Sequence, residues 1–562
     1  MYGRNRDYME VRDELKEIIE AARDKAVAAG DLPEGNYAPV QKLEVPPQKE
    51  FGDFSSNAAM QWARTAHQAP RKIAEAIVGH IDSPLVDRMD IAGAGFINFY
   101  LTKDTVYTEL RHILEAGDTY GDLPLRKDDT VLVEYVSANP TGPLHIGHAR
   151  GAAYGDAMVR LYRAAGYNVA SEYYINDAGS QIRHLGESIN ARYLQLLGKD
   201  VEVPADGYRG QDIVETAKHI LDRDGDKYLS MTDEERIDTF KELGLKEKLA
   251  ALRKDLENFH VTFDRWYSER TLYPEKVHAA LQVLKDEGMM YEKEGAWWLS
   301  TTKNGDDKDR VVIRANGEPT YFCSDIAYAK DKFDRGFKTL VDIWGADHHG
   351  YIIRLKTAIK FLGYNPDAFL VDLLQMVTLL RDGQPVKMSK RTGQAVTLAE
   401  LIEEVGADAA RYFFTSRTLD SQMEFDINLA KKESSENPVY YIQYANARIH
   451  SLLSQAKEAG VTWKGLENTD LTLLKKECEL DLIKKMDVYH ELIENAARER
   501  APHRIARYAY DLASLFHHFY RECRILGVAP ELTQARLALI LAVQDVLVHA
   551  MTILGVSAPE RM

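Results

Sequence analysis

The stretch between residues 131 and 175 constrains the fold most, because it predicts a strand, a loop, a helix and a second strand in that order. Residues 131–136 are a short apolar run rich in β-branched residues, and residues 169–175 are expected to form a second strand. The intervening Ser-Ala-Asn-Pro-Thr-Gly-Pro at 137–143 cannot continue a strand, and a helical pattern follows from 145 to 165. A unit of this kind joins parallel neighbouring strands, so the sequence predicts an α/β domain with a parallel sheet.

The loop of this unit is the expected ligand site, because ligands bind beyond the carboxyl ends of parallel strands. It leads into Pro-Leu-His-Ile-Gly-His at 143–148. A helix N-terminus offers free N–H groups and attracts phosphate. His145 and His148 share one face of the first turn and could donate hydrogen bonds to a triphosphate, while Gly147 lets a ligand approach the backbone. The alternative is that both histidines only cap the helix.

A second stretch, Val-Lys-Met-Ser-Lys-Arg-Thr-Gly at 386–393, is a cationic loop with a glycine. Its charges, Lys387 and Lys390 among them, could stabilise a leaving pyrophosphate as the loop closes. Taken alone, such a loop is more often solvated surface. The two stretches together are a strong signal.

His-Ile-Gly-His followed by Lys-Met-Ser-Lys resembles class I aminoacyl-tRNA synthetases. The resemblance implies a Rossmann-like catalytic domain that makes an aminoacyl adenylate and transfers the aminoacyl group to tRNA. Gly-Ala-Asp-His-His at 345–349 resembles the third class I element. There Gly345 and Asp347 would face the adenosine ribose or the substrate amine, although the usual Asp-Gln is Asp-His in this chain.

Within class I, the chain is similar to the arginyl-tRNA synthetases over nearly its whole length. The similarity is carried by Val-Glu-Tyr-Val-Ser-Ala-Asn-Pro-Thr-Gly at 133–142, Tyr-Tyr-Ile-Asn-Asp-Ala-Gly at 173–179, Tyr-Phe-Cys-Ser-Asp at 321–325 and the terminal Ala-Pro-Glu-Arg-Met. It implies an arginine–tRNA ligase with arginine, ATP and tRNA(Arg) as substrates and Mg²⁺ as cofactor. Members of this subgroup generally need bound tRNA before they activate the amino acid.

The chemistry of arginine supports the same choice. A guanidinium has five donors in a planar fork and no acceptor, so a selective pocket needs carboxylates and a flat wall. Glu134 and Asp325 could be the two acids and Tyr321 the wall, one helical turn before Asp325. For a single acid near a strand end, a structural salt bridge is the commoner role. Asn139 and Asp347 are candidates for the substrate's α-amino group.

The resemblance assigns further roles residue by residue. No protein nucleophile is needed, because the arginine carboxylate attacks the α-phosphate, and we expect no metal held by protein ligands alone. The catalytic residues would be His145, His148, Lys387 and Lys390. ATP would be bound by His145, Gly147, His148, Gly345, Asp347, Met376, Val377, Lys387 and Lys390. Arginine would be bound by Glu134, Asn139, His145, Tyr321, Asp325 and Asp347.

The sequence divides into three expected domains. Residues 1–120 would form an α+β domain for the tRNA elbow, where Asn98 could read a base edge. Residues 121–425 would form the catalytic domain, with charged helical insertions at about 185–300. Residues 426–562 show only helical patterns and would form the anticodon-binding bundle. There Tyr444 and Arg448 could stack a base and hold a phosphate, and Arg504 could contact a phosphate, although ordinary packing or solvated surface would explain all three.

Composition bounds these expectations. A net charge of −16 indicates that any nucleic-acid contact uses local basic patches. Cys323, Cys478 and Cys523 lie too far apart in sequence for a disulfide framework or a CxxC zinc site. The first ten residues are polar, and the longest apolar stretch, 537–556, is interrupted by polar residues. We expect a cytoplasmic monomer without a membrane segment.

Three rival functions stay open at this point. A lysyl or glutamyl class I synthetase would have one acid, or basic residues, in its pocket. A catalytically inactive RNA-binding homologue would be expected to have lost one of His145, His148, Lys387 or Lys390. A nucleotidyltransferase without a tRNA partner would leave the first domain and the helical tail without a role.

Overall fold

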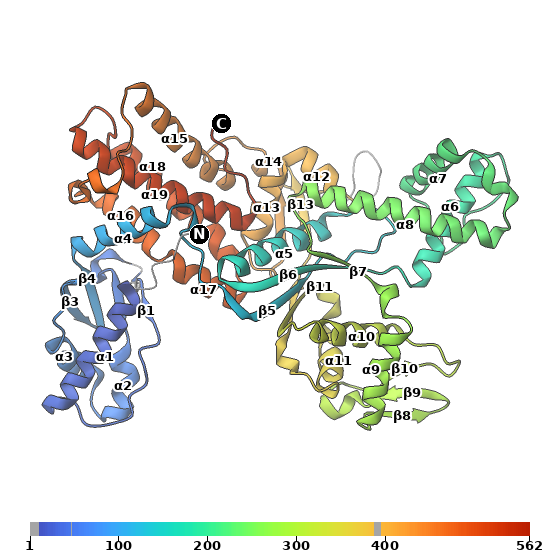
Figure 1. Cartoon of the computed structure of the whole chain (residues 1–562), viewed down its shortest axis with the longest axis horizontal. Helices are drawn as coiled ribbons and strands as arrows, with labels where there is room; N and C mark the ends of the chain where they lie inside the picture. The colour runs from blue at the N-terminus through green and yellow to red at the C-terminus, as the bar shows by residue number, and fades with distance from the viewer. Residues whose placement is uncertain (1–10, 47, 387–394) are drawn as a thin grey trace. The chain divides into compact units, whose positions relative to one another are not determined.

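The computed structural model describes residues 11–46, 48–386 and 395–562, and these form two compact units (Figure 1). The first unit comprises Met1–Tyr120, Leu452–Val488 and Ser514–Val546. The second comprises Gly121–Ser451, Tyr489–Ala513 and Leu547–Met562. Three long helices have residues in both units. They are α15 (Pro438–Glu458), α18 (His503–Glu522) and α19 (Pro530–Leu554).

The second unit is built on a five-stranded sheet in the order β12-β11-β5-β6-β7, and every neighbouring pair is parallel. The expected α/β class with a parallel sheet is confirmed. The strands are β5 (Arg126–Glu134), β6 (Tyr167–Ile175), β7 (Arg265–Ser268), β11 (Thr339–Gly345) and β12 (Phe369–Leu374). The central strand β5 buries its apolar run at Val131, Leu132 and Val133, as a strand covered on both faces should.

Helix α5 (Ile146–Ala164) makes the crossover from β5 to β6. It begins one residue after His145, as the sequence predicts, and it packs closely because its buried face carries many small residues. A Cβ at Gly155 would lie 2.2 Å from Cγ of Tyr135, so this position has no room for a side chain. From β5 the chain proceeds to β6 and β7 on one side and later to β11 on the other. The strand order therefore reverses between β5 and β11, where a ligand crevice is expected.

Strand β7 falls within residues 185–300, where the sequence shows charged helical insertions and no strand signal. The helices there are α6 (Ser180–Leu196), α7 (Gln211–Asp224) and α8 (Asp233–Asn258), with their own small core. β7 has only four residues, Arg-Trp-Tyr-Ser, and it lies at the sheet edge. A strand that short in a charged neighbourhood gives no periodic pattern to recognise.

Another layer of the second unit packs against one face of the five-stranded sheet. The antiparallel strands β8 (Met290–Lys293), β9 (Ala296–Leu299) and β10 (Arg310–Ile313) form a small sheet. They share one apolar core with α9 (Glu275–Asp286), α10 (Tyr321–Asp334) and α11 (His349–Phe361). This core fixes α10 against β5 and β11, because Leu132 and Leu340 belong to it as well.

The remaining elements of the second unit follow β12. They are β13 (Val377–Arg381), β14 (Gln384–Val386), α12 (Leu398–Val405), α13 (Ala407–Thr415), β15 (Met423–Asp426), α14 (Ile427–Ala430) and α17 (Tyr489–Glu499). Arg411 on α13 is fully buried and joins distant segments. Its guanidinium contacts Asp156 on α5 at 2.5 Å, and it donates to the carbonyls of Phe259 at 2.9 Å and Leu554 at 3.1 Å.

The first unit is an α+β layer with helical segments. Its sheet has the order β1-β2-β4-β3, and all its pairs are antiparallel. The elements are α1 (Val11–Ala29), β1 (Leu43–Glu44), β2 (Phe54–Ser56), α2 (Ala58–Ala66), α3 (Pro70–Gly79), β3 (Val86–Ala92), β4 (Phe96–Leu101), α4 (Lys103–Ala116) and α16 (Glu477–Asp487). Cys478 and Cys523 lie here as buried free thiols with their sulfurs 3.5 Å apart, and Cys323 is a buried free thiol of the second unit.

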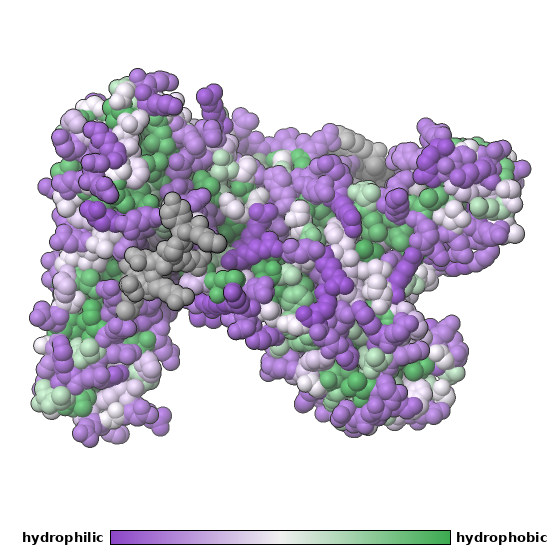
Figure 2. All heavy atoms as spheres, viewed as in Figure 1, coloured by the Kyte–Doolittle hydropathy of each residue, from purple (hydrophilic) through white to green (hydrophobic). Residues whose placement is uncertain are grey.

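Among the described helices, α19 is long and apolar enough to cross a membrane by length and composition alone, with 67% of its apolar window buried inside the protein. Burial of that kind is the pattern of a core helix. Figure 2 shows polar and charged side chains over most of the visible face, with apolar ones scattered between them.

Candidate active site

A cavity of about 470 Å³ lies where the sheet order reverses, beside the carboxyl ends of β5, β6 and β11. Its volume is within the range of small-molecule sites. α10 and α11 complete its wall. It is lined by Glu134, Val136, Ser137, Tyr174, Asn176, Tyr321, Asp325, Tyr328, Ala329, Lys332, Asp342, Ile343, Trp344, Gly345, His348, Tyr351, Leu355 and Phe369. The structure thus brings together three residues predicted for arginine, namely Glu134, Tyr321 and Asp325.

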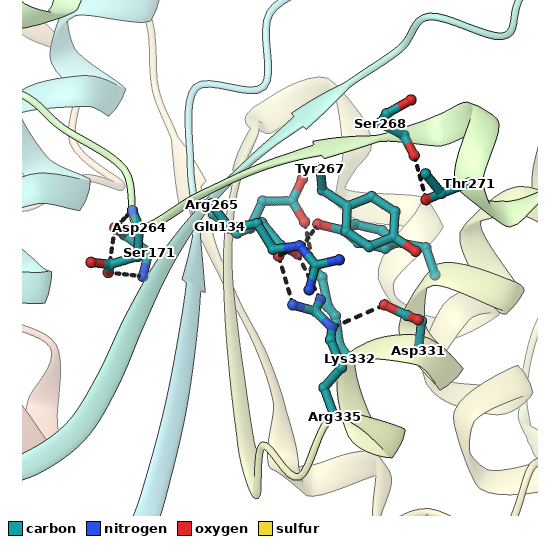
Figure 3. A network of polar contacts seen from close by, with 12 residues as sticks. Glu134, Ser171, Asp264, Arg265, Tyr267, Ser268, Thr271, Asp331, Lys332 and Arg335 are labelled. Carbon is teal, nitrogen blue, oxygen red and sulfur yellow. Dashed lines mark hydrogen bonds and ion pairs between the residues drawn. The ribbon is translucent and has the colours of Figure 1, made fainter.

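Glu134, at the end of β5, already has polar partners inside the protein. Its Oε2 lies 2.5 Å from the ammonium of Lys332, and its Oε1 accepts from the hydroxyl of Ser137 at 3.0 Å. Lys332 also contacts both oxygens of Asp342, at 2.9 and 3.0 Å. Figure 3 shows Glu134 within the polar network that Asp331, Lys332 and Arg335 of α10 form.

Asp325 lies in a different situation, although it lines the same cavity. The hydroxyl of Tyr351 donates to its Oδ2, and within the described residues it has no ion pair. Burial first, and the charge of Glu134 as well, raise the pKa of Asp325 to about 6, against the lowering by the Tyr351 hydrogen bond. A buried carboxylate without a cationic partner is costly, so this position favours a cationic ligand.

A further acid beside the cavity escaped the sequence analysis. Glu269 begins the short 3-10 helix Glu269–Leu272 directly after β7, and it is only 3% exposed. Burial and the charge of Asp325 raise its pKa to about 7. The signal was available in principle, because an acid at the carboxyl end of a parallel strand lies at the ligand edge, but β7 itself was not recognised.

The turn after β5 is strained where it meets the cavity. Val136 and Ser137 have φ angles of 67° and 40°, a left-handed conformation that is unfavourable for residues with a side chain. The hydroxyl of Ser137 accepts from the N–H of Tyr174 at 3.0 Å as it donates to Glu134. The strained turn therefore ties β5 to β6 and fixes the Glu134 carboxylate.

His145 and His148 adopt a defined arrangement at the start of α5. His145 is the cap residue and its Nδ1 accepts from the N–H of Gly147 at 3.1 Å, while Nδ1 of His148 accepts from the N–H of His145 at 3.3 Å. Their rings stack with centroids 3.8 Å apart. Burial lowers the pKa of His145, and burial with the charge of His145 lowers that of His148 to about 4. Both rings are therefore neutral at pH 7 and carry their proton on Nε2, which is free to donate.

The described flanks of the Lys-Met-Ser-Lys stretch meet this helix start. The N–H of Ile146 donates to the carbonyl of Val396 at 3.3 Å, and the N–H of Leu398 donates to the carbonyl of Leu144 at 2.8 Å. Lys387 and Lys390 themselves lie outside the described residues. Within the described residues, no group of three or more His, Cys, Asp or Glu side chains could hold a metal ion.

Of the other predicted ligand residues, only Gly345 belongs to the described lining of the cavity. Gly345 lines the cavity, and a Cβ there would approach Oδ1 of Asp347 to 2.6 Å. The Asp347 side chain is 82% exposed, and Asn139 is also exposed and not part of the cavity wall. Met376 is 80% exposed and Val377 begins β13.

The segment before Met376 is fastened by Arg150 of α5, which is fully buried. Arg150 donates to the carbonyls of Gln375, Thr418 and Ser421 at 3.0, 2.7 and 2.9 Å. The helix that carries His148 and the segment predicted for ATP are thereby joined through one side chain.

The residues predicted for tRNA are held by neighbours. Asn98 is buried in β4 and its amide oxygen accepts from Ser55 at 2.7 Å. Arg448 lies over the ring of Tyr444, with its guanidinium carbon 4.5 Å from the ring centroid. Arg504 pairs with Glu499 at 2.7 Å.

Comparison with known proteins decides the family. Residues 12–101, 109–426 and 442–562 match the profiles of the arginyl tRNA synthetase N-terminal domain, the class I (R) tRNA synthetase catalytic domain and the DALR anticodon-binding domain. The arginine–tRNA ligase of Bacillus licheniformis is 49% identical over 558 residues, which cover 99% of this chain and 100% of that protein. The enzyme of the same name from Carboxydothermus hydrogenoformans is 48% identical, covering 97% and 98%. The chain belongs to the arginyl-tRNA synthetases.

Solved structures agree with this membership of the arginyl-tRNA synthetases. A Campylobacter jejuni structure described as an arginyl-tRNA synthetase is 38% identical, with a TM-score of 0.77, and covers 82% of this chain and 100% of its own. Thermus thermophilus arginyl-tRNA synthetase, at 22% identity, shows the same fold with a TM-score of 0.75, covering 98% and 100%. The predicted family and the class I catalytic fold with an N-terminal domain and a C-terminal helical domain are confirmed.

Proposed function

We propose that this member of the family activates L-arginine with ATP to arginyl-adenylate and pyrophosphate, and then transfers the arginyl group to the 3′ end of tRNA(Arg). Family membership supports the overall reaction. The assignment of residues to its steps rests on the cavity.

The observation that carries the assignment is Asp325, a buried acid without a cationic partner among the described residues, in a cavity of about 470 Å³. A guanidinium would supply the missing charge, and the ring of Tyr321 at the rim would cover its flat face. The Glu134 carboxylate, at the end of β5, would accept from the guanidinium with its remaining lone pairs. Glu269, directly after β7, would add negative potential near Asp325. Citrulline lacks the charge, and lysine offers a single ammonium without the fork geometry, so both should be rejected.

ATP would lie at the start of α5. The neutral rings of His145 and His148 would donate from Nε2 to phosphate oxygens, and Gly147, Gly345, Asp347, Met376 and Val377 would surround the nucleoside. Mg²⁺ commonly binds substrate phosphates together with one or two carboxylates. The described acids are therefore compatible with a Mg²⁺ ion that binds together with ATP. When bound, Mg²⁺ would neutralise part of the phosphate charge.

In the first step the arginine carboxylate attacks the α-phosphate and pyrophosphate leaves, so the protein supplies alignment and charge rather than a nucleophile. Lys387 and Lys390 would stabilise the leaving group, in keeping with the contacts of Val396 and Leu398 beside the helix start. Asn139 and Asp347 would hold the α-amino group. In the second step a terminal ribose hydroxyl of tRNA attacks the adenylate carbonyl and AMP leaves.

We assign tRNA contacts by domain: 1–120 to the elbow with Asn98, and 426–562 to the anticodon with Tyr444, Arg448 and Arg504. Residues 121–425, with insertions at about 185–300, would form the catalytic domain. The arginine side chains in these contacts would exchange their present partners for phosphates. We further propose a monomer that acts in the cytoplasm without a membrane.

The test is charging of total tRNA with each labelled amino acid and ATP, together with pyrophosphate exchange with and without tRNA. Charging with arginine alone is expected, and exchange that requires tRNA would place the enzyme in the subgroup that completes its site on tRNA. Charging with a different amino acid would refute the pocket assignment. Absence of charging with any amino acid would refute the proposed activity.

A further inference from the structure

The cavity wall contains a buried cation that the proposed reaction does not use. Lys332, on α10, has a side chain only 2% exposed, and its ammonium lies between Glu134 of β5 and Asp342 of β11. An ammonium is costly to bury unless it is well paired. Here it makes three contacts of 2.5, 2.9 and 3.0 Å with two carboxylates, which satisfies its three N–H groups.

The contact with Lys332 is one half of a clamp on Glu134. Lys332 holds Oε2, while Ser137 holds Oε1 from the strained turn after β5. A carboxylate has about four acceptor sites, so both oxygens can still accept from a ligand. The two contacts therefore fix the orientation of the Glu134 carboxylate and leave acceptor sites on its oxygens for a ligand.

Lys332 also sets the charge of the cavity. Among the described lining residues, the acids are Glu134, Asp325 and Asp342, and Lys332 is the one lysine or arginine. Like charges at this depth cannot all stay ionised without a cation, and one of the acids would take up a proton or move. Lys332 pairs with Glu134 and Asp342, and Asp325 is left as the lining acid that has no ion pair among the described residues.

A neighbouring lysine offers a close comparison. Lys276 on α9 forms an ion pair of 2.6 Å with Asp331, which lies on α10 next to Lys332. Neither Lys276 nor Asp331 lines the cavity. Both lysines pair with an aspartate. They differ in contact with Glu134 and in burial, because the Lys276 side chain is 41% exposed and that of Lys332 only 2%.

We propose that Lys332 is a positioning residue for arginine recognition, whose ammonium orients the Glu134 carboxylate without touching the substrate. The inference rests on the proposed function of the cavity. Its signature is a change confined to arginine binding, because Lys332 and Glu134 are not among the residues assigned to ATP.

The experiment measures KM for arginine and for ATP, with kcat, in charging assays on the full-length enzyme. Lys332→Met should raise KM for arginine at least 30-fold and leave KM for ATP within threefold and kcat within fivefold. The matched variant Lys276→Met should leave KM for arginine within threefold. Equal increases for arginine and ATP, an unchanged arginine KM, or an equal effect of Lys276→Met would overturn the proposal.

Two further variants keep the test decisive if Lys332→Met does not fold. Lys332→Met/Asp342→Asn removes one buried acid along with the ammonium, and it should reproduce the arginine defect in a folded protein. Asp342→Asn alone keeps the ammonium on Glu134, so its arginine KM should rise at least tenfold less than that of the double variant, and an equal rise would assign control of the pocket to Asp342 instead. If the parent enzyme does not charge tRNA with arginine, the proposed function fails, whereas a parent that charges and a Lys332→Met variant with normal arginine KM refute this inference alone.

Discussion

Replacing Asp325 with asparagine should change stability and arginine affinity in opposite directions. Asparagine keeps an oxygen that can accept from Tyr351 but carries no charge. The folded protein raises the pKa of Asp325 from 3.8 to about 6, so folding disfavours its ionised form. The difference corresponds to at most about 3 kcal/mol of destabilisation above pH 6, and it vanishes below about pH 4, where the carboxyl is protonated in both states.

Calorimetry of the ligand-free Asp325→Asn enzyme should therefore show a melting temperature a few degrees higher at pH 8, with a smaller gain at pH 5.5. Arginine binding should suffer, because losing one partner of a buried charged pair costs about 2–5 kcal/mol. At about 1.4 kcal/mol per factor of ten, KM for arginine should rise by roughly 30-fold to several thousand-fold, and KM for ATP should stay within threefold.

Asp331→Asn is the matched control for this prediction. Asp331 lies on the same helix, but it is paired with Lys276 and Arg335, so its loss should lower stability and leave arginine KM nearly unchanged. A lower melting temperature for Asp325→Asn, or equal rises in KM for arginine and ATP, would refute the reasoning that Asp325 is an acid kept unpaired for a cationic ligand.

Three further substitutions test other parts of the structure. Gly147→Ala would place a Cβ 3.0 Å from Cε1 of His145, so we expect pyrophosphate exchange to slow about 10- to 100-fold with an unchanged melting temperature; a normal rate would contradict the role of that ring. Gly155→Ala would press on Tyr135 at 2.2 Å and should cost about 3 kcal/mol, measured as a loss of thermal stability. Tyr444→Ala should raise KM for tRNA about tenfold if the ring stacks on a base, without changing KM for arginine or ATP; an unchanged KM for tRNA would restrict Tyr444 to packing.

Local patterns in the sequence predicted the elements that hold the two histidines proposed to bind ATP. The strand, loop and helix around His145 depend on neighbours in the chain, and the helix starts where the sequence indicated. Continuous apolar spacing was less informative in the tail. Helical apolar spacing runs through 473–495 without a mark where α16 ends at Asp487 and α17 begins at Tyr489, because apolar periodicity persists through a short break between two helices.

Long-range pairing could not be predicted. Glu134 and Asp325 were equivalent candidates in the sequence, and the structure distinguishes them only through Lys332, which lies 198 residues from Glu134 in the chain. Whether a buried acid is compensated depends on which side chains the fold brings beside it. Glu269 was missed for the same reason, since its place near Asp325 follows from an edge strand too short to recognise.

The contacts of Arg411 bear on how the chain matures during synthesis. Its guanidinium depends on the carbonyl of Leu554, and the ribosome adds that residue 143 residues after Arg411. Until α19 has been synthesised, this guanidinium lacks one of its acceptors. The residues that supply the others, Asp156 and Phe259, have by then already been synthesised. The nascent sheet with α5 can form early, but we expect the region around Arg411 to resist proteolysis only after α19 has been synthesised. The packing around α5 is therefore completed only once α19 has been synthesised.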